Sequence, residues 1–188
     1  MATGHADPRR RERIVAAALD LIADEGVAGV SHRKVAARAQ VPLGSMTYHF
    51  AGLDDLLRQA FAAFADHVVA LFEHHLSRAT DREQAREAVT DLVHVLSRSP
   101  SRDLVLTQEL YTLAARRPEF RELTHQWMRR SRCLLERHFD ADTARQLDAL
   151  IEGMSLHRAL DTRPHDRALT RQAVARITAD QRPPDGPM

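Results

Sequence analysis

Apolar residues recur along most of the chain at intervals of three and four, whereas the alternation typical of β-strands is almost absent. The first such set occupies one face of a helix and consists of Ile14, Ala17, Ala18, Leu21 and Ile22. Pro8 fits the first turn of this helix, where no N–H is needed, and Gly26 follows its end. Because similar sets follow along the rest of the chain, the pattern predicts an all-α protein of about nine helices.

Two short helices joined by a tight turn are predicted next. Ser31 can begin the first of them, because its hydroxyl can accept an N–H from the first helical turn. Val41-Pro42 ends that helix, since a residue before proline avoids the helical region, and residues 43–49 fit the second helix. Gln40 then occupies the turn position where glycine is usual, and a left-handed backbone there would cost it about 1 kcal/mol relative to glycine.

Longer helices are predicted beyond residue 52. The segment 104–115 is apolar on nearly all sides, which is typical of a buried central helix, and Pro118 is placed to open the next helix. The segment 140–160 carries two apolar stripes, one of Leu147, Leu150, Ile151 and Met154 and the other of Ala149, Gly153, Leu156 and Leu160. We expect two domains, at residues 8–56 and 57–180, and flexible termini at residues 1–7 and 181–188.

Composition limits the class of protein. The chain has 188 residues, 44% of them hydrophobic, and can form one ordinary domain or two small ones with a buried core. Its single cysteine, Cys133, excludes an intrachain disulfide and a cysteine-based zinc site. No apolar run approaches the roughly 18 residues of a membrane span. The arginine-rich N-terminal segment lacks the apolar core of a secretory signal, so we expect a cytoplasmic protein.

The charge is unevenly distributed. The formal net charge is only +1, which at first argues against a nucleic-acid partner. However, the 28 residues from Gly26 to Leu53 contain no Asp or Glu, while Arg33, Lys34 and Arg38 give this stretch a charge of +3. No other acid-free stretch is longer than 13 residues. Because carboxylates would repel phosphates, this stretch has the charge pattern that a DNA-facing surface requires.

The same stretch carries a recognisable pattern. Two short helices and a tight turn are the outline of a helix-turn-helix. The segments Gly26-Val27-Ala28-Gly29-Val30-Ser31, Val35-Ala36 and Val41-Pro42-Leu43-Gly44-Ser45-Met46-Thr47-Tyr48-His49-Phe50 resemble the DNA-binding domain of TetR-type (tetracycline-repressor-like) transcriptional regulators. The remaining two-thirds of the chain resembles that family in helix count, length and apolar pattern.

The resemblance implies a role for each matching position. Residues on the recognition helix would face the major groove, and these are Leu43, Gly44, Ser45 and Thr47. Tyr48 and His49 would reach sugar and phosphate, and Arg33 a phosphate or a guanine edge. Ser31 and His32 would contact the DNA backbone. Many members have a second aromatic residue where this chain has Thr47 and a lysine where it has Leu53. The missing lysine removes one phosphate anchor, which predicts modest non-specific affinity.

The resemblance also implies a homodimer that binds a pseudo-palindromic operator and is released by a small-molecule effector. Polar residues within apolar stripes are the candidates for the effector pocket, namely His67, Gln108, Tyr111, Trp127 and His157. The small-residue stripe Ala149, Gly153, Leu156 and Leu160 is the candidate dimer interface. The alternative is structural: the polar residues can be ordinary core residues, and both stripes of segment 140–160 can be buried within one subunit.

Other functions find less support in the sequence. His67 and His74 share a helix face but lack the i, i+4 spacing of a metal pair, and we expect neither a metal nor a cofactor. No nucleophile elbow, phosphate loop or dinucleotide fingerprint is present, and we expect Cys133 to be a packing residue, so an enzyme is not favoured. A constitutive dimeric DNA-binding protein without an effector, and more remotely a helical enzyme, stay open as alternatives to an effector-responsive repressor.

Overall fold

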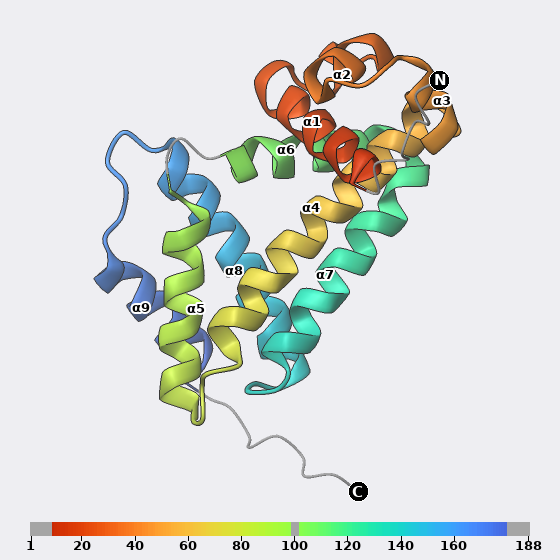
Figure 1. Ribbon diagram of the computed structural model, residues 1–188. Helices are drawn as coiled ribbons and strands as arrows, with labels where there is room; N and C mark the ends of the chain where they lie inside the picture. Colours follow the sequence, from red (N-terminus) through yellow and green to blue (C-terminus); the bar gives the residue numbers. More distant parts are fainter. Residues whose placement is uncertain (1–8, 99–101, 180–188) are drawn as a thin grey trace, which may run out of the picture. The chain divides into compact units, whose positions relative to one another are not determined.

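A computed structural model describes residues 9–98 and 102–179, and this part of the chain contains helices and no strand (Figure 1). Its α-helices are α1 (Arg10–Glu25), α2 (His32–Ala39), α3 (Gly44–His49), α4 (Leu53–Leu76), α5 (Arg82–Leu96), α6 (Arg102–Arg116), α7 (Arg121–Leu135), α8 (Ala141–Leu160) and α9 (Arg167–Ile177). Two 3₁₀ helices, η1 (Val27–Gly29) and η2 (Pro118–Phe120), precede α2 and α7. The predicted all-α class is confirmed. The expected flexible termini and Pro8 lie outside the described residues.

The chain forms two compact units. Among the described residues, the first contains 9–65 and 105–123, and the second contains 66–98, 102–104 and 124–179. The helices α4, α6 and α7 therefore each contribute residues to both units. The first unit includes the described part of the domain expected at residues 8–56, which we call the head. The unit extends further than this domain because most of α6 packs within the unit.

Within the first unit, the local structure of the two short helices follows the predicted chemistry. Ser31 is the N-cap of α2, and its hydroxyl accepts the N–H of Lys34 at 3.3 Å. Gln40 ends α2 in the left-handed region at φ 54° and ψ 47°, and it is the single non-glycine residue with positive φ in the described ranges. The turn is closed by the N–H of Val41, which bonds the carbonyl of Ala36 at 3.0 Å.

The apolar faces of α1, α2 and α3 form the core beneath this turn. Ile14, Ala18 and Ile22 of α1 are fully buried, as is Val35 of α2. Met46 of α3 is also fully buried. These residues fix the position of α3, because a six-residue helix has little stability of its own and depends on packing.

One expectation for the middle of the chain is wrong. Segment 104–115 is not buried on all sides, because only the face with Leu106, Leu110 and Leu113 points inward, while Val105 is 40% exposed. Pro118 opens a helix as predicted, namely the 3₁₀ helix η2, which leads directly into α7 at Arg121. A single apolar face means that α6 is amphipathic, with polar side chains free to contact other elements of its unit.

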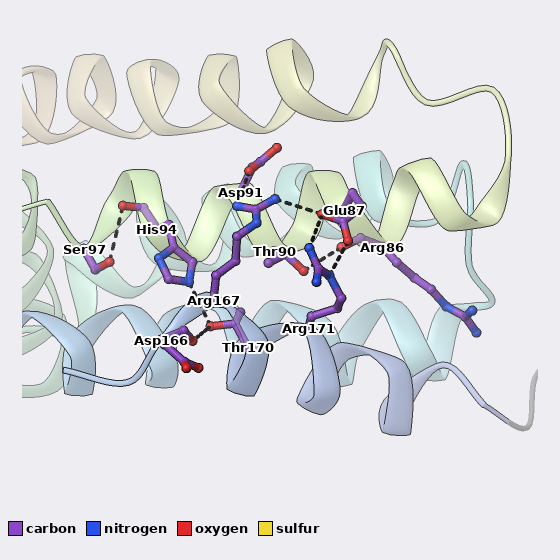
Figure 2. Close-up of polar contacts among 10 residues, drawn as sticks. All are labelled: Arg86, Glu87, Thr90, Asp91, His94, Ser97, Asp166, Arg167, Thr170 and Arg171. Carbon is purple, nitrogen blue, oxygen red and sulfur yellow. Dashed lines mark hydrogen bonds and ion pairs between the residues drawn. The ribbon is translucent and has the colours of Figure 1, made fainter. Parts of the chain in front are cut away.

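In the second unit, α5 packs against both α8 and α9, and ion pairs also join α9 to α5 (Figure 2). Arg167 binds Glu87 at 2.9 Å and Asp91 at 2.5 Å, and Arg171 binds Glu87 at 2.6 Å. These hydrogen bonds hold the pKa of Glu87 below its ordinary value.

No helix in the described ranges combines the length and the apolarity needed to cross a membrane.

Candidate nucleic-acid interface

The most exposed large apolar side chains of the first unit lie on α3 and the turn before it. Tyr48 is 84% exposed and Leu43 is 54% exposed. On the opposite side of the same short segment, Met46 and Phe50 are buried. The burial of one side therefore anchors α3 and leaves the other side presented to solvent.

The structure brings the predicted contact residues into two adjoining segments of one unit. Ser31, His32 and Arg33 are the N-cap and first turn of α2, and Leu43, Gly44, Thr47, Tyr48 and His49 belong to the turn and α3. Gly44, Thr47 and Tyr48 are exposed and His49 is half-buried. The Thr47 hydroxyl donates to the carbonyl of Gly44 at 3.1 Å, which leaves its oxygen able to accept from a ligand.

Ser45 differs from its predicted position. Ser45 is only 8% exposed, because it lies on the side of α3 that faces the core, next to Met46. Its assignment as a groove-facing residue is therefore wrong for this conformation of the chain. His32 is half-buried, and its Nε2 is buried without a hydrogen-bond partner among the described residues.

Ion pairs reduce the positive charge that the sequence places on this surface. Lys34 Nζ lies 2.5 Å from Glu25 Oε2, and Arg38 Nη1 lies 2.8 Å from Asp24 Oδ2. Both carboxylates belong to the end of α1, just before the acid-free stretch, so a count within the stretch misses them. Arg33 is exposed and takes part in no ion pair or hydrogen bond within the described residues. Of the three cations in the acid-free stretch, it is the one without a carboxylate partner in the part of the chain that the structure describes.

This arrangement has the chemistry of a helix-turn-helix that reads a major groove. The start of α2 presents a guanidinium, whose fork matches the acceptors of guanine or phosphate. The short α3 presents a hydroxyl, an apolar side chain and an aromatic ring on one surface. Small and apolar side chains allow close approach of a helix to base edges, and backbone contacts fix its register.

The candidate pocket residues are spread over both units. Gln108 and Tyr111 belong to the first unit and are half-buried, while Trp127 belongs to the second and is 8% exposed. His67 and His157 are exposed, so the expectation that they are embedded in an apolar interior is wrong. The inward positions on this part of α4 are occupied by Phe64 and Val68. The Nε2 of His67 lies 3.5 Å from Asp103 Oδ2.

Two cavities lie within single units. One of about 330 Å³ is lined by α1 and α4, and the other, of about 430 Å³, is lined by the end of α4, the following loop and α5. Neither is lined by any of the five candidate pocket residues.

Within the part of the chain that the structure describes, no three His, Cys, Asp or Glu residues gather as a possible metal site. Cys133 is exposed rather than packed, because the following Leu134 occupies the buried face.

The small-residue stripe of α8 lies outside the core of its unit. Ala149 and Leu160 are exposed, and Gly153 and Leu156 are half-buried. By contrast, Leu147 and Ile151 of the other stripe are buried. The alternative in which both stripes are buried within one subunit is therefore wrong.

Comparison with known proteins bears on the function of this surface. The family described as bacterial regulatory proteins of the tetR family matches residues 14–60, and the tetracyclin repressor-like C-terminal domain matches residues 80–180. No match is found among curated protein sequences.

Solved structures give full-length similarity. SCO7518 of Streptomyces coelicolor A3(2), a candidate transcriptional regulator, is 69% identical, with a TM-score of 0.88 over 92% of this chain and 100% of that one. The multidrug binding protein EbrR, in complex with ethidium, is 37% identical with a TM-score of 0.76 over 91% and 99%. The TetR-family protein SCO1917 of the same Streptomyces is 36% identical with a TM-score of 0.79 over 91% and 99%. The helix-turn-helix surface, the two matched domains and these similarities show that the chain belongs to the TetR family of DNA-binding transcriptional regulators.

Proposed function

We propose that the protein is a cytoplasmic repressor that binds a pseudo-palindromic operator as a homodimer and releases it when a small-molecule effector binds. The observation that carries the proposal is the exposed surface of Arg33, Leu43, Thr47 and Tyr48 on a helix-turn-helix. One such head contacts few base pairs, whereas a dimer fixes two heads at a spacing matched to the DNA repeat. Symmetry of the protein therefore implies symmetry of the operator.

Arg33 and Tyr48 are the side chains whose removal tests the DNA surface. Arg33→Ala and Tyr48→Ala should each weaken operator binding about tenfold or more, the usual cost of losing a good base or backbone contact. The measurement is a gel-shift titration on the duplex that the parent protein selects from a random pool. Arg129→Ala removes an exposed arginine from the second unit and serves as the matched control. Parent-like binding by both variants would show that another surface reads DNA.

The small-residue stripe of α8, which lies outside the core of its unit, is our proposed dimer interface. Leu156→Asp places a charge in the middle of this stripe, where close packing of two apolar faces would leave it without a partner. We expect this variant to sediment as a monomer while the parent sediments as a dimer. Ser77→Asp adds the same charge at an exposed position outside α8 and α9 and should stay dimeric. A dimeric Leu156→Asp protein would exclude this interface.

For the effector, we propose an aromatic organic cation. The support is similarity to EbrR, whose solved complexes contain ethidium, proflavin and malachite green. Of the five residues expected from the sequence, Trp127 stays our candidate for a pocket of the second unit. Because Trp127 is the single tryptophan, its fluorescence reports on a ligand that binds nearby.

Malachite green should quench Trp127 fluorescence saturably and lower the affinity for the selected duplex. An anionic aromatic dye, anilinonaphthalene sulfonate, is the control for non-specific dye binding. An effector changes DNA affinity only if it prefers the conformation that does not bind DNA. Quenching without any change in DNA affinity would contradict induction by this ligand class. Absence of both effects would favour the constitutive regulator.

A further inference from the structure

A carboxylate of α6 contacts the backbone that joins α1 to α2. Glu109 Oε2 accepts the N–H of Val27 at 2.9 Å, although the two residues are 82 positions apart in the chain. Both residues belong to the first unit. Val27 is the first residue of the 3₁₀ helix η1, so the carboxylate supplies the N-terminal cap of that turn. A negative charge at this end of a helical turn also interacts favourably with the exposed N–H groups.

Gly26 makes room for this contact. Its backbone has φ 72° and ψ 170°, a combination that L side chains rarely adopt. A Cβ at this position would lie 3.1 Å from Glu109 Oε1. The missing side chain thus serves two purposes: it permits the sharp exit from α1, and it allows the carboxylate to approach.

The capped turn determines how the chain enters α2. Within η1, the N–H of Gly29 bonds the carbonyl of Gly26 at 3.1 Å, and the N–H of Val30 bonds that of Val27 at 3.2 Å. Val30 is buried, and the next residue, Ser31, caps α2. Arg33 follows within the first turn of α2. A change at Val27 is therefore transmitted over a few residues of fixed backbone to the DNA-contacting residues.

The segment that follows α6 makes a second contact with the head. Arg117 holds both oxygens of Asp54, in the first turn of α4, through Nη1 at 2.9 Å and Nη2 at 2.6 Å. Glu119 accepts from the same guanidinium at 2.8 Å. These hydrogen bonds hold the pKa of Asp54 below its ordinary value. The end of α6 is thereby tied to α4 close to the end of α3.

We infer that Glu109 is a positioning residue for DNA recognition, because its carboxylate on α6 fixes the α1–α2 turn and with it the start of α2. This inference rests on the DNA surface proposed above. It assigns to α6 a direct bond to the head, so a shift of α6 would alter the angle at which α2 leaves α1. The bond is specific to a side chain that reaches a backbone N–H, and it is therefore separable from the apolar packing of Leu106 and Leu110.

The test compares Glu109→Ala, which removes the acceptor, with Glu109→Gln, whose amide oxygen can still accept from Val27. We expect Glu109→Ala to speed amide hydrogen exchange at Val27 at least about tenfold and to weaken operator binding about tenfold, as for loss of a charged hydrogen bond. Glu109→Gln should recover most of both. Thr112→Ala, at an exposed position of α6, is the control and should change neither.

The outcomes distinguish this inference from the proposed DNA surface. Parent-like DNA affinity of Glu109→Ala would overturn the positioning role, as would unchanged exchange at Val27. If the Ala and Gln variants lose DNA affinity equally, the charge of Glu109 and not its hydrogen bond to Val27 is the cause. That result would also overturn the positioning role. Arg33→Ala should lose DNA affinity with unchanged Val27 exchange. If Arg33→Ala and Tyr48→Ala bind like the parent while Glu109→Ala does not, the proposed surface fails, and the inference that Glu109 positions that surface is overturned with it, whereas weaker binding by all three variants supports both.

Discussion

The ion pairs of α2 with α1 predict that the affinity of the head for DNA is limited by its own carboxylates. Asp24 holds Arg38 and Glu25 holds Lys34, so two of the three cations in the acid-free stretch are partly neutralised. The perturbation is the double variant Asp24→Asn, Glu25→Gln. It keeps the shape of both side chains and removes both negative charges.

The magnitude follows from counterion release. Each phosphate neutralised by a protein cation contributes about 0.9 to the slope of log affinity against log salt, so two freed cations steepen it by up to about 1.8. The pairs are exposed, with side-chain exposures of 39% to 57%, and each is worth no more than about 1 kcal/mol. A cation in such a weak pair can leave its carboxylate to bind phosphate, so removing the carboxylate gives only part of the full effect. We therefore expect about a tenfold gain in non-specific DNA affinity at 0.1 M salt.

Folding should be little affected by the same change. Asp24 and Glu25 lie in the last turn of α1, where negative charge opposes the helix dipole by about 0.3–1 kcal/mol. Their removal therefore offsets the loss of two weak ion pairs. A change in DNA binding with an unchanged unfolding midpoint would thus report on charge rather than on structure.

The assay is fluorescence anisotropy with a labelled duplex of arbitrary sequence over a series of KCl concentrations. The control Glu136→Gln, Asp142→Asn changes the net charge by the same amount at exposed positions of the second unit. A parent slope for the Asp24, Glu25 variant would show that these two carboxylates do not limit DNA affinity. An equal gain by the control would show that net charge, and not local pairing, sets the affinity.

Three further predictions concern stability. Gln40→Gly should raise the free energy of unfolding by about 0.5–1 kcal/mol in urea, because glycine tolerates the left-handed backbone at φ 54°, and a loss would contradict strain there. Arg132 Nε lies 2.9 Å from Asp148 Oδ2 in a mostly buried pair, so Arg132→Met should cost about 3 kcal/mol and Arg132→Met, Asp148→Leu much less; equal losses would contradict the pairing. Burial lowers the pKa values of His94 and His165, so the unfolded chain binds more protons and thermal stability should fall as pH drops below about 6.5. The double variant His94→Gln, His165→Gln should flatten that decline, and an unchanged pH profile would exclude these groups as its cause.

The helix-turn-helix could be predicted from the sequence because its determinants are local. The Ser31 cap, the break at Val41-Pro42 and the left-handed Gln40 each depend on neighbours within four residues. Met46 is fully buried and marks the inward side of α3. Ser45 was assigned outward by resemblance, and its burial depends on how α3 is rotated against the core, which no local pattern fixes.

Contacts between distant segments could not be predicted in the same way. The bond from Glu109 to Val27 joins positions 82 residues apart, and nothing in the amphipathic pattern of α6 identifies its backbone partner. The pairing of Asp24 with Arg38 was missed for a different reason. Charge was counted along the chain, whereas α1 and α2 pack side by side and bring carboxylates to the edge of an acid-free stretch. Charge near a site has to be counted in space.

Exposed large apolar side chains occur both on the proposed DNA surface and on the proposed dimer surface. Single exposed residues of this kind are common, so their position carries more weight than their number. Leu43 and Tyr48 lie on the short segment whose other side is buried, and Leu160 and Leu169 lie on α8 and α9, at 68% and 49% exposure. Leu160 belongs to a stripe visible in the sequence, but Leu169 does not, since it lies in the first turns of α9, opposite the buried Val174 side. A face of α9 that includes Leu169 would extend the α8 stripe across a second helix. In that case Leu169→Asp should also dissociate the dimer, whereas an interface made by α8 alone would tolerate it.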